Sequence, residues 1–227
     1  MDFIFMLTHH DRTVSDCLAV AEQIRPLGLR HVGFKDVGVG MDVLHALTRT
    51  LKAQGATVYM EVVTTSGPDC LASARNALQL GVDCLLGGTA VEATQAILDG
   101  TRIAYLPFPG RPHDHPTRLG GNAAQITEDC RRFRAAGCAG ADLLAYRATE
   151  AEPVELVRGA RTGLGDGKLI VAGSIASRAR LAEIAVAGAD AFTVGTAVFD
   201  GSWAPHAGTL EAQLRAVQAD RDVVVAA

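Results

Sequence analysis

The sequence lacks the features that mark several protein classes. Its five cysteines include no CxxC pair, so neither a disulfide framework nor a zinc ribbon is expected. No basic run occurs and the net charge is −4, which argues against a nucleic-acid-binding surface. No apolar stretch approaches the roughly 20 residues of a membrane helix, and no basic leader precedes the first apolar run. A cytoplasmic protein that contacts neither nucleic acid nor a membrane is therefore expected.

The composition is that of a chain that folds around a sizeable core. Hydrophobic residues make up 48% of the 227 residues and charged residues 20%, which makes disorder unexpected. No change of composition and no linker divides the chain, so we expect one domain over residues 1–227. Lysine is scarce: Lys35, Lys52 and Lys168 are the only three, and each is worth placing in the fold.

Short apolar runs alternate with longer segments whose apolar residues recur three and four positions apart. This alternation predicts parallel strands joined by helices. The predicted strands are residues 3–7, 31–34, 57–62, 83–86, 103–106, 141–144, 168–172 and 191–194. The predicted helices include residues 16–27, 41–54, 69–80, 123–136 and 178–187. Eight such units favour closure into a single (β/α)₈ TIM barrel, with an open doubly wound sheet as the structural alternative.

Two details of the pattern support this interpretation. Five of the predicted helices end in a glycine just before the next strand, as Gly81 and Gly188 do, and glycine suits the left-handed residue that ends a helix. Strands such as residues 169–172 are continuously apolar, as expected for a parallel sheet that is buried on both faces. The segment 107–121 is rich in proline and glycine and cannot be helical, so we expect a loop that covers the site.

The active site of such a barrel lies at the carboxyl ends of its strands. The last two strands are followed by Gly173-Ser174 and by Gly195-Thr196, where free backbone N–H groups can bind an anion. A phosphate site is therefore predicted at these four residues, although the glycines could instead serve only tight turns.

Residues 172–201, AGSIASRARLAEIAVAGADAFTVGTAVFDG, resemble the ribulose-phosphate-binding barrel superfamily, and distantly its histidine-biosynthesis isomerases. The resemblance implies that Gly173, Ser174, Gly195 and Thr196 hold the phosphate of the substrate. The same pattern in other barrels holds a flavin phosphate. The isomerases use aspartates after strands one and five, and this chain lacks them at the matching positions, so their reaction is not transferred.

Lys35, at the end of the second strand, is the strongest candidate for a catalytic residue. A partly desolvated lysine can act as a base or form a Schiff base with a carbonyl group. Glu61, near the end of the third strand, is its expected acid/base partner, and Asp36 is a further candidate. The alternative is a structural ion pair of Lys35 with Glu61 or with Asp36 that closes the top of the barrel.

Further candidates follow other strands. His9, after the first strand, is expected to assist as a general acid or base. Arg147, with Tyr146 before it, and the loop residues Arg111 and His113 are expected to bind the substrate. Histidine and carboxylate side chains occur at the ends of several strands, but no two of them have the sequence spacing of known metal ligands. No metal site and no cofactor is therefore predicted.

These features together predict an enzyme for a small phosphorylated carbonyl substrate, a sugar phosphate or sugar-acid phosphate. The expected reaction is that of a lyase, such as an aldolase, or an isomerase, through an enediolate or Schiff-base intermediate. Two alternatives remain open: a barrel that binds a flavin or nucleotide phosphate in a redox or carrier role, and a non-catalytic sensor of a phosphorylated ligand. A homodimer is a general expectation for such a protein.

Overall fold

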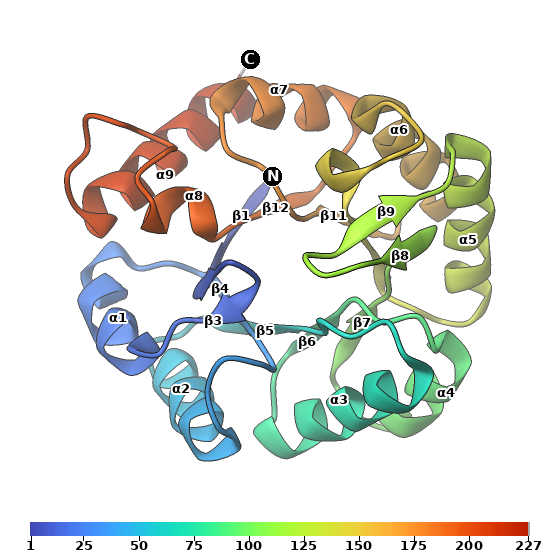
Figure 1. Ribbon diagram of the computed structural model, residues 1–227, viewed down its shortest axis with the longest axis horizontal. Coiled ribbons are helices and arrows are strands. Elements are labelled where there is room, and N and C mark those ends of the chain that lie inside the picture. Colours follow the sequence, from blue (N-terminus) through green and yellow to red (C-terminus); the bar gives the residue numbers. More distant parts are fainter. Residues whose placement is uncertain (227) are drawn as a thin grey trace.

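The computed structural model of the protein describes residues 1–226 and shows a ring of parallel strands surrounded by helices (Figure 1). The barrel strands are β1 (Asp2–Met6), β4 (His31–Lys35), β5 (Thr57–Glu61), β6 (Cys84–Leu86), β7 (Ala104–Leu106), β10 (Gly140–Leu143), β11 (Lys168–Val171) and β12 (Ala191–Val194). Their spatial order is β10-β11-β12-β1-β4-β5-β6-β7, and every neighbouring pair in this order is parallel.

Two backbone hydrogen bonds join the ends of this sheet and close the ring. The Ala139 N–H donates to the Tyr105 carbonyl at 2.9 Å, and the Asp142 N–H donates to the Pro107 carbonyl at 3.0 Å. The predicted TIM barrel is confirmed, and the open sheet is excluded. All eight predicted strands are present, with bounds that differ from the predicted ones by at most one residue at either end.

Helices follow the strands and cover the outside of the barrel (Figure 1). They are α1 (Cys17–Ile24), α2 (Met41–Ala53), α3 (Gly67–Leu80), α4 (Val91–Leu98), α5 (Ala123–Ala135), α6 (Pro153–Leu164), α7 (Arg178–Ala187), the short α8 (Thr196–Phe199) and α9 (Leu210–Ala226). Gly81 and Gly188 end α3 and α7 in the left-handed conformation, as predicted. None of the helices in residues 1–226 combines the length and apolar character needed to cross a membrane.

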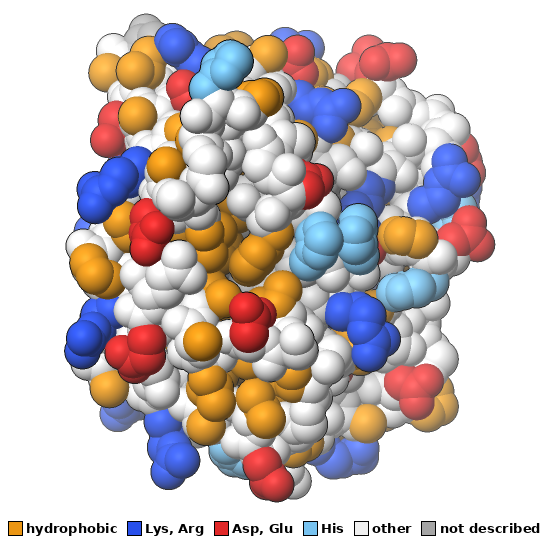
Figure 2. Space-filling model, turned by 60° about the vertical axis from the view of Figure 1, so that its left-hand side comes forward, with side chains coloured by type: hydrophobic (Ala, Val, Ile, Leu, Met, Phe, Trp, Pro, Cys, Tyr) orange, Lys and Arg blue, Asp and Glu red, His pale blue; other side chains and the backbone are white. Residues whose placement is uncertain are grey.

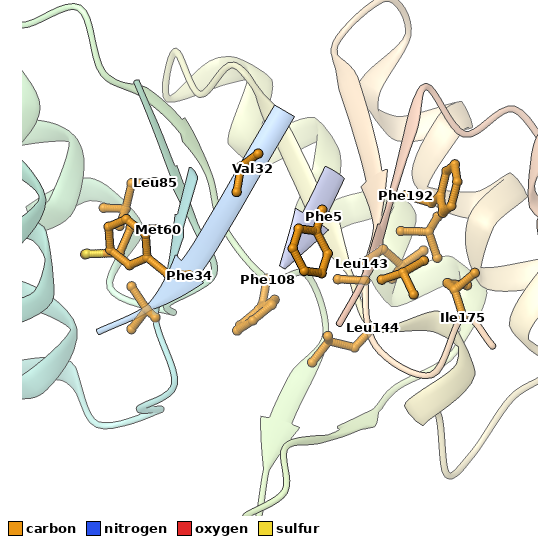
Figure 3. Close-up of a cluster of buried hydrophobic side chains, with 14 of the residues drawn as sticks. Phe5, Val32, Phe34, Met60, Leu85, Phe108, Leu143, Leu144, Ile175 and Phe192 are labelled. Carbon is orange, nitrogen blue, oxygen red and sulfur yellow. The ribbon is translucent and has the colours of Figure 1, made fainter. Parts of the chain in front are cut away.

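Side chains of each strand alternate between the barrel interior and the helix layer. The interior cluster consists of Ile4, Met6, Tyr59, Leu86, Leu106, Ile170 and Ala191. A larger cluster lies between strands and helices, and Figure 3 shows part of it, including Phe5, Phe34 and Phe192. Because both faces of the sheet are buried, the strands read as continuous apolar runs. On the face shown in Figure 2, acidic and basic side chains are interspersed.

Two hairpins extend from the carboxyl-terminal rim of the barrel. The first joins β2 (Thr8–His9) to β3 (Arg12–Thr13), directly after β1. The second joins β8 (Arg111–His113) to β9 (Arg118–Gly120), and it replaces the irregular loop expected over residues 107–121. Its four bounding residues pair in register, so this segment has an ordered scaffold of its own above β7 (Figure 1).

Candidate active site

A cavity of about 730 Å³ opens at the carboxyl ends of the strands. Its wall is formed by the first hairpin, the ends of β4 and β5, the second hairpin, and the segments that follow β10, β11 and β12. This volume lies within the roughly 300–1,000 Å³ typical of small-molecule sites. The position agrees with the general location of TIM-barrel sites, so the residues that line this cavity define the candidate active site.

Lys35 is held firmly at the floor of the cavity. Its backbone N–H donates to Thr13 Oγ1 at 2.9 Å, and the Thr13 hydroxyl donates to the Lys35 carbonyl at 2.7 Å. Its Nζ lies 2.8 Å from Asp11 Oδ1 and 3.3 Å from Glu61 Oε1. Lys35 and Glu61 are register partners on β4 and β5, so the parallel sheet itself places their side chains side by side.

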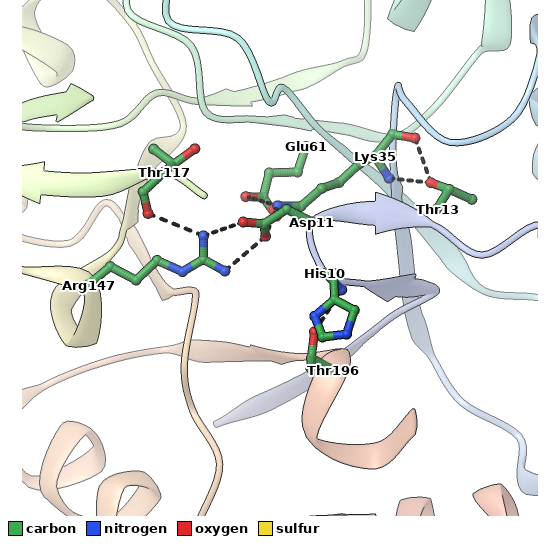
Figure 4. Close-up of polar contacts among 8 residues, drawn as sticks. All are labelled: His10, Asp11, Thr13, Lys35, Glu61, Thr117, Arg147 and Thr196. Carbon is green, nitrogen blue, oxygen red and sulfur yellow. Dashed lines mark hydrogen bonds and ion pairs between the residues drawn. The ribbon is translucent and has the colours of Figure 1, made fainter. Parts of the chain in front are cut away.

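Asp11 joins Lys35 to a second cation, as Figure 4 shows. Arg147 Nη1 lies 2.7 Å from Asp11 Oδ2, and Arg147 Nη2 lies 2.8 Å from Asp11 Oδ1. This is a bidentate pair, the geometry in which arginine binds a carboxylate most strongly. Asp11 has φ +59°, an uncommon left-handed conformation for an aspartate, and this turn directs its carboxylate inward. The two cations and two carboxylates form one network, in which Lys35, Asp11 and Glu61 are buried and Arg147 is partly buried.

Arg147 also connects the network to the second hairpin and to the loop after β11. It lies in the 3₁₀ turn η2 (Ala145–Arg147), and its Nη1 donates to the Thr117 carbonyl at 3.2 Å. Its side chain passes so close to Gly173 that a Cβ at that glycine would be 2.6 Å from Arg147 Nε. Gly173, with φ +73°, therefore gives Arg147 room to reach Asp11.

The charges of the network follow from these contacts. Burial alone would raise the pKa of the Asp11 carboxyl, but hydrogen bonds and charges from Arg147 and Lys35 hold that pKa well below its usual range. Burial alone would lower the pKa of Lys35, but the Glu61 and Asp11 carboxylates outweigh it and raise that pKa. Lys35 is therefore an ammonium at neutral pH, which differs from the lowered pKa expected of a lysine base.

The loops after β11 and β12 present backbone N–H groups to the same cavity. The N–H groups of residues 173–176 and 195–197 donate to no acceptor within residues 1–226, and all seven of these residues line the cavity. Ser174 has φ +59°, so two successive left-handed residues, Gly173 and Ser174, shape the first loop. Arg180 lies beside it and donates from Nη1 to the Ser174 carbonyl at 2.5 Å. Such concave groups of free N–H donors bind anions.

Gly195 has a packing role as well as a place in the cavity wall. A Cβ at this position would be 2.6 Å from Thr8 Oγ1 and 2.7 Å from the Thr8 carbonyl. The absence of a side chain thus lets the loop after β12 lie directly against the first hairpin. The nearby His10 N–H donates to Thr196 Oγ1 at 3.3 Å, which ties the same two segments together.

The Gly195→Ala variant is expected to be destabilised by roughly 1–3 kcal/mol, because the added methyl group overpacks the contact with Thr8. For a chain of this size each kcal/mol lowers Tm by about 2–4 °C. Thermal unfolding followed by circular dichroism measures the change. The control is Gly208→Ala, since a Cβ at Gly208 meets nothing within 4 Å. Equal Tm values for the two variants would contradict the packing argument.

Eight of the twelve predicted site residues line this one cavity, and they are Lys35, Glu61, Tyr146, Arg147, Gly173, Ser174, Gly195 and Thr196. Tyr146 donates from its hydroxyl to the Glu183 carboxylate, and the Arg180 guanidinium lies 4.7 Å from the centre of its ring. Tyr146 therefore helps to hold Arg180 at the edge of the cavity.

The other four lie outside the cavity lining. Asp36 directly follows Lys35, accepts a hydrogen bond from Ser73 on α3 and does not line the cavity. His9 does not line the cavity either: the centre of its ring lies 3.9 Å from that of His10, and its buried Nε2 has no hydrogen-bond partner among residues 1–226.

The two remaining residues lie on β8 of the second hairpin and do not line the cavity. Arg111 Nη2 lies 2.6 Å from Glu150 Oε2, and this pair fastens the hairpin to the segment that precedes α6. His113 Nδ1 lies 3.0 Å from Asp114 Oδ2 near the exposed tip. The Arg111–Glu150 contact joins the hairpin to another segment, and neither pair lines the cavity.

Two carboxyl groups, Asp11 in the cavity and Asp142 in the barrel interior, have no assigned role in the sequence interpretation. Asp11 follows His9 and His10 in a turn whose left-handed backbone no local pattern predicts. Asp142 lies in the apolar strand β10 and is completely buried. A lone carboxylate inside an apolar strand is a signal that the sequence does contain, because such a residue is almost never buried without a reason.

No protein-family model matches the chain, and no curated protein matches it. Among solved structures it is similar to a mutant of mandelate oxidase with a monooxide FMN adduct. That comparison has a TM-score of 0.65 and 16% identity, and it covers 99% of this chain and 73% of that chain. It is also similar to orotidine 5′-phosphate decarboxylase from Pyrococcus horikoshii OT3, with a TM-score of 0.65, 14% identity, and coverage of 98% and 99%.

A designed cube-shaped protein cage built from fused oligomeric domains gives a TM-score of 0.64 at 10% identity, and the match covers 98% of this chain and 74% of that chain. At such low identities these likenesses establish the fold and nothing finer. The chain has the TIM-barrel fold, and its relation to the histidine-biosynthesis isomerases stays a prediction.

Proposed function

We propose that the protein is an enzyme that forms a carbanion beside the carbonyl group of a small phosphorylated substrate, as a lyase or an isomerase. The observation that carries the proposal is the position of two unlike groups in one cavity. Free N–H groups of residues 173–176 and 195–197 lie on one side, and the Asp11–Lys35–Glu61–Arg147 network forms the floor. A phosphate bound by the first group places the rest of a small molecule over the second.

Lys35 is proposed to stabilise the negative oxygen of an enediolate. An ammonium held by Asp11 and Glu61 is positioned before the substrate arrives, and preorganised charge of this kind is the largest contribution to many enzyme rates. The raised pKa of Lys35 makes the enediolate the preferred intermediate, since a Schiff base requires the neutral amine.

Glu61 is proposed to move the proton. It takes a proton from the carbon next to the carbonyl group, so the electron pair of the C–H bond passes into the enediolate. An isomerase then returns a proton to the neighbouring carbon, and a lyase couples the same carbanion to cleavage or formation of a bond. The similarity to orotidine 5′-phosphate decarboxylase, whose name specifies a phosphorylated substrate, is compatible with this proposal at the level of fold.

Hydrogen–deuterium exchange tests the carbanion step without knowledge of the product. A panel of aldose and ketose phosphates is incubated with the protein in D₂O, and loss of the proton beside the carbonyl group is followed by NMR. At least one compound is expected to exchange, and Glu61→Gln is expected to slow exchange by roughly 10²–10⁴-fold. Inorganic phosphate should compete with the substrate.

The unphosphorylated sugars are the control for the phosphate site and should exchange much more slowly. Borohydride reduction of the same mixtures separates the two intermediates, because a mass adduct on Lys35 would favour the Schiff base over the enediolate. Absence of exchange with every member of the panel would contradict the proposed reaction.

A flavin-binding barrel is the second candidate, favoured by the likeness to mandelate oxidase with its FMN adduct. The free N–H groups suit a flavin phosphate equally well. The floor fits a flat, largely apolar ring system less well, since it is built from charged side chains, and Tyr146 is already covered by Arg180. A purified protein with the visible absorbance of a flavin would decide for this candidate.

A further inference from the structure

Arg180 lines the cavity beside the loop after β11, and neither the sequence interpretation nor the mechanism described above gives it a role. It lies in the first turn of α7 and is partly buried. Within residues 1–226 it forms no ion pair with a carboxylate. Lys35 and Arg147, in the same cavity, both do. Arg180 therefore brings a positive charge to the cavity that no carboxylate of the described chain neutralises.

Two contacts hold the Arg180 side chain in place. Its Nη1 donates to the Ser174 carbonyl at 2.5 Å. Its guanidinium carbon lies 4.7 Å from the centre of the Tyr146 ring, within the range of a cation–π contact. The Tyr146 hydroxyl in turn donates to the Glu183 carboxylate on α7, which fixes the ring. A side chain that is held in this way loses little conformational entropy when it binds a ligand.

The fixed guanidinium still has hydrogen-bond donors available. Its contact with Ser174 uses only part of its planar set of N–H groups, and the others have no acceptor within residues 1–226. The same loop supplies the free backbone N–H groups of residues 173–176. Backbone N–H groups in such a loop bind anions, and arginine matches the geometry of phosphate with two parallel hydrogen bonds. The side chain and the loop therefore suit the same kind of ligand group.

We propose that Arg180 makes this site selective for a phosphomonoester, by contacting the phosphate oxygens beside the backbone N–H groups of residues 173–176, and that Tyr146 is its positioning residue. The inference rests on the proposed function only for the phosphorylated character of the ligand. It adds a full positive charge, which backbone N–H groups lack and which favours a doubly charged phosphate over a singly charged carboxylate. Binding of phosphate to the free protein tests it without any turnover.

Arg118 is a second arginine of the cavity wall and provides a matched control. It lies on β9 in the second hairpin and is exposed, and its side chain has no hydrogen-bond or ion-pair partner among residues 1–226. Replacement of either arginine by glutamine removes the same charge from the same cavity. Of the two, Arg180 is held by contacts, so a fixed binding group and a general electrostatic attraction give different results.

Inorganic phosphate, titrated into the substrate-free protein and followed by ³¹P NMR, measures the dissociation constant. Arg180→Gln is expected to weaken binding by roughly 10–100-fold, because charge-assisted hydrogen bonds are lost. Arg180→Lys keeps the charge without the paired donors and should have an intermediate affinity. Arg118→Gln should weaken binding by less than about 5-fold. Equal losses in Arg180→Gln and Arg118→Gln, or no phosphate binding by the native protein, would overturn the inference.

Selectivity is measured with acetate as the singly charged probe. The native protein should bind phosphate more tightly than acetate, and Arg180→Gln should reduce the affinity for phosphate more than that for acetate. An unchanged ratio of the two affinities in Arg180→Gln would contradict the role of Arg180 in selectivity.

Substitutions of Tyr146 test the positioning of Arg180. Tyr146→Phe keeps the ring beside the guanidinium and loses only the hydroxyl contact with Glu183, so its affinity for phosphate should stay near the native value. Tyr146→Leu removes the ring and should weaken phosphate binding by roughly 2–10-fold. Equal affinities in the native protein and both variants would overturn the positioning role.

Glycerol phosphate and flavin mononucleotide distinguish a small phosphate ester from a flavin as the source of the phosphate group. The one that binds more tightly identifies the source, and Arg180→Gln should weaken its binding by roughly 10–100-fold, as for phosphate. An unchanged affinity would overturn the inference. Deuterium exchange tests the carbanion reaction separately. Exchange with an unchanged KM in Arg180→Gln would overturn the inference and leave that reaction standing, whereas Arg180-dependent phosphate binding without any exchange would support the inference and contradict the reaction.

Discussion

Lys35→Met is expected to destabilise the protein by about 3–5 kcal/mol and to abolish exchange of every substrate that the native protein accepts. Methionine fills a similar volume but removes the charge between Asp11 and Glu61. Lys35 is 4% exposed and Glu61 5% exposed, so the carboxylates left behind are not compensated by water. Asp11 keeps Arg147, and Glu61 loses its ion-pair partner.

The matched control for this variant is Lys52→Met. Lys52 Nζ lies 2.9 Å from Asp83 Oδ1, close to the distance in the Lys35–Asp11 pair, but both side chains are about two-fifths exposed. Exposed pairs of this kind contribute about 0–1 kcal/mol. Denaturant unfolding measures both variants. Similar losses at the two lysines would show that the buried network does not have the stabilising role assigned to it here.

Asp11→Asn is expected to have an effect of similar size, about 3–5 kcal/mol at neutral pH, for the opposite reason. It removes the carboxylate that lies between Lys35 and Arg147, so that the buried Lys35 and the partly buried Arg147 remain with Glu61. Without one of its two carboxylate neighbours, Lys35 should also have a lower pKa than in the native protein. The variant should therefore react more readily with a carbonyl compound under borohydride.

The loss in Asp11→Asn should depend on pH in a defined direction. The folded-state pKa of Asp11 lies below that of an unfolded carboxyl, so its carboxylate stabilises the fold fully above pH of about 4. That contribution disappears as the pH falls through the lowered folded-state pKa. The stability difference between native protein and variant should thus be widest at neutral pH and should narrow in acid.

Denaturant midpoints measured from pH 7 downward check this dependence, with Asp222→Asn as the control. Asp222 is 66% exposed and pairs only with the adjacent Arg221 among residues 1–226, so its replacement should leave the midpoints nearly unchanged. A constant difference between native protein and Asp11→Asn across the acid range would contradict the lowered pKa.

Much of the site could be predicted, because in a closed barrel the place of a residue along its strand determines the end of the barrel at which it lies. Once the carboxyl ends of parallel strands are known, the residues that follow them must gather at one rim. This is why Lys35, Glu61 and Arg147 line one cavity with the loops after β11 and β12, although they are far apart in the chain. Asp36 could have been separated from Lys35 by the same logic, since successive strand residues face opposite sides.

The sequence by itself determined the barrel, because apolar runs, helical spacing and glycine stops are local properties that repeat along the chain. Only the tertiary structure decided which polar groups meet. Asp11 reaches Lys35 and Arg147 through a left-handed turn. Arg111 and His113 pair with Glu150 and Asp114 and do not line the cavity. Strand register places Asp142 in the barrel interior, where its side chain is completely buried. These outcomes depend on contacts between segments that are distant in the chain. Such contacts produce no repeating residue pattern that a single sequence could show.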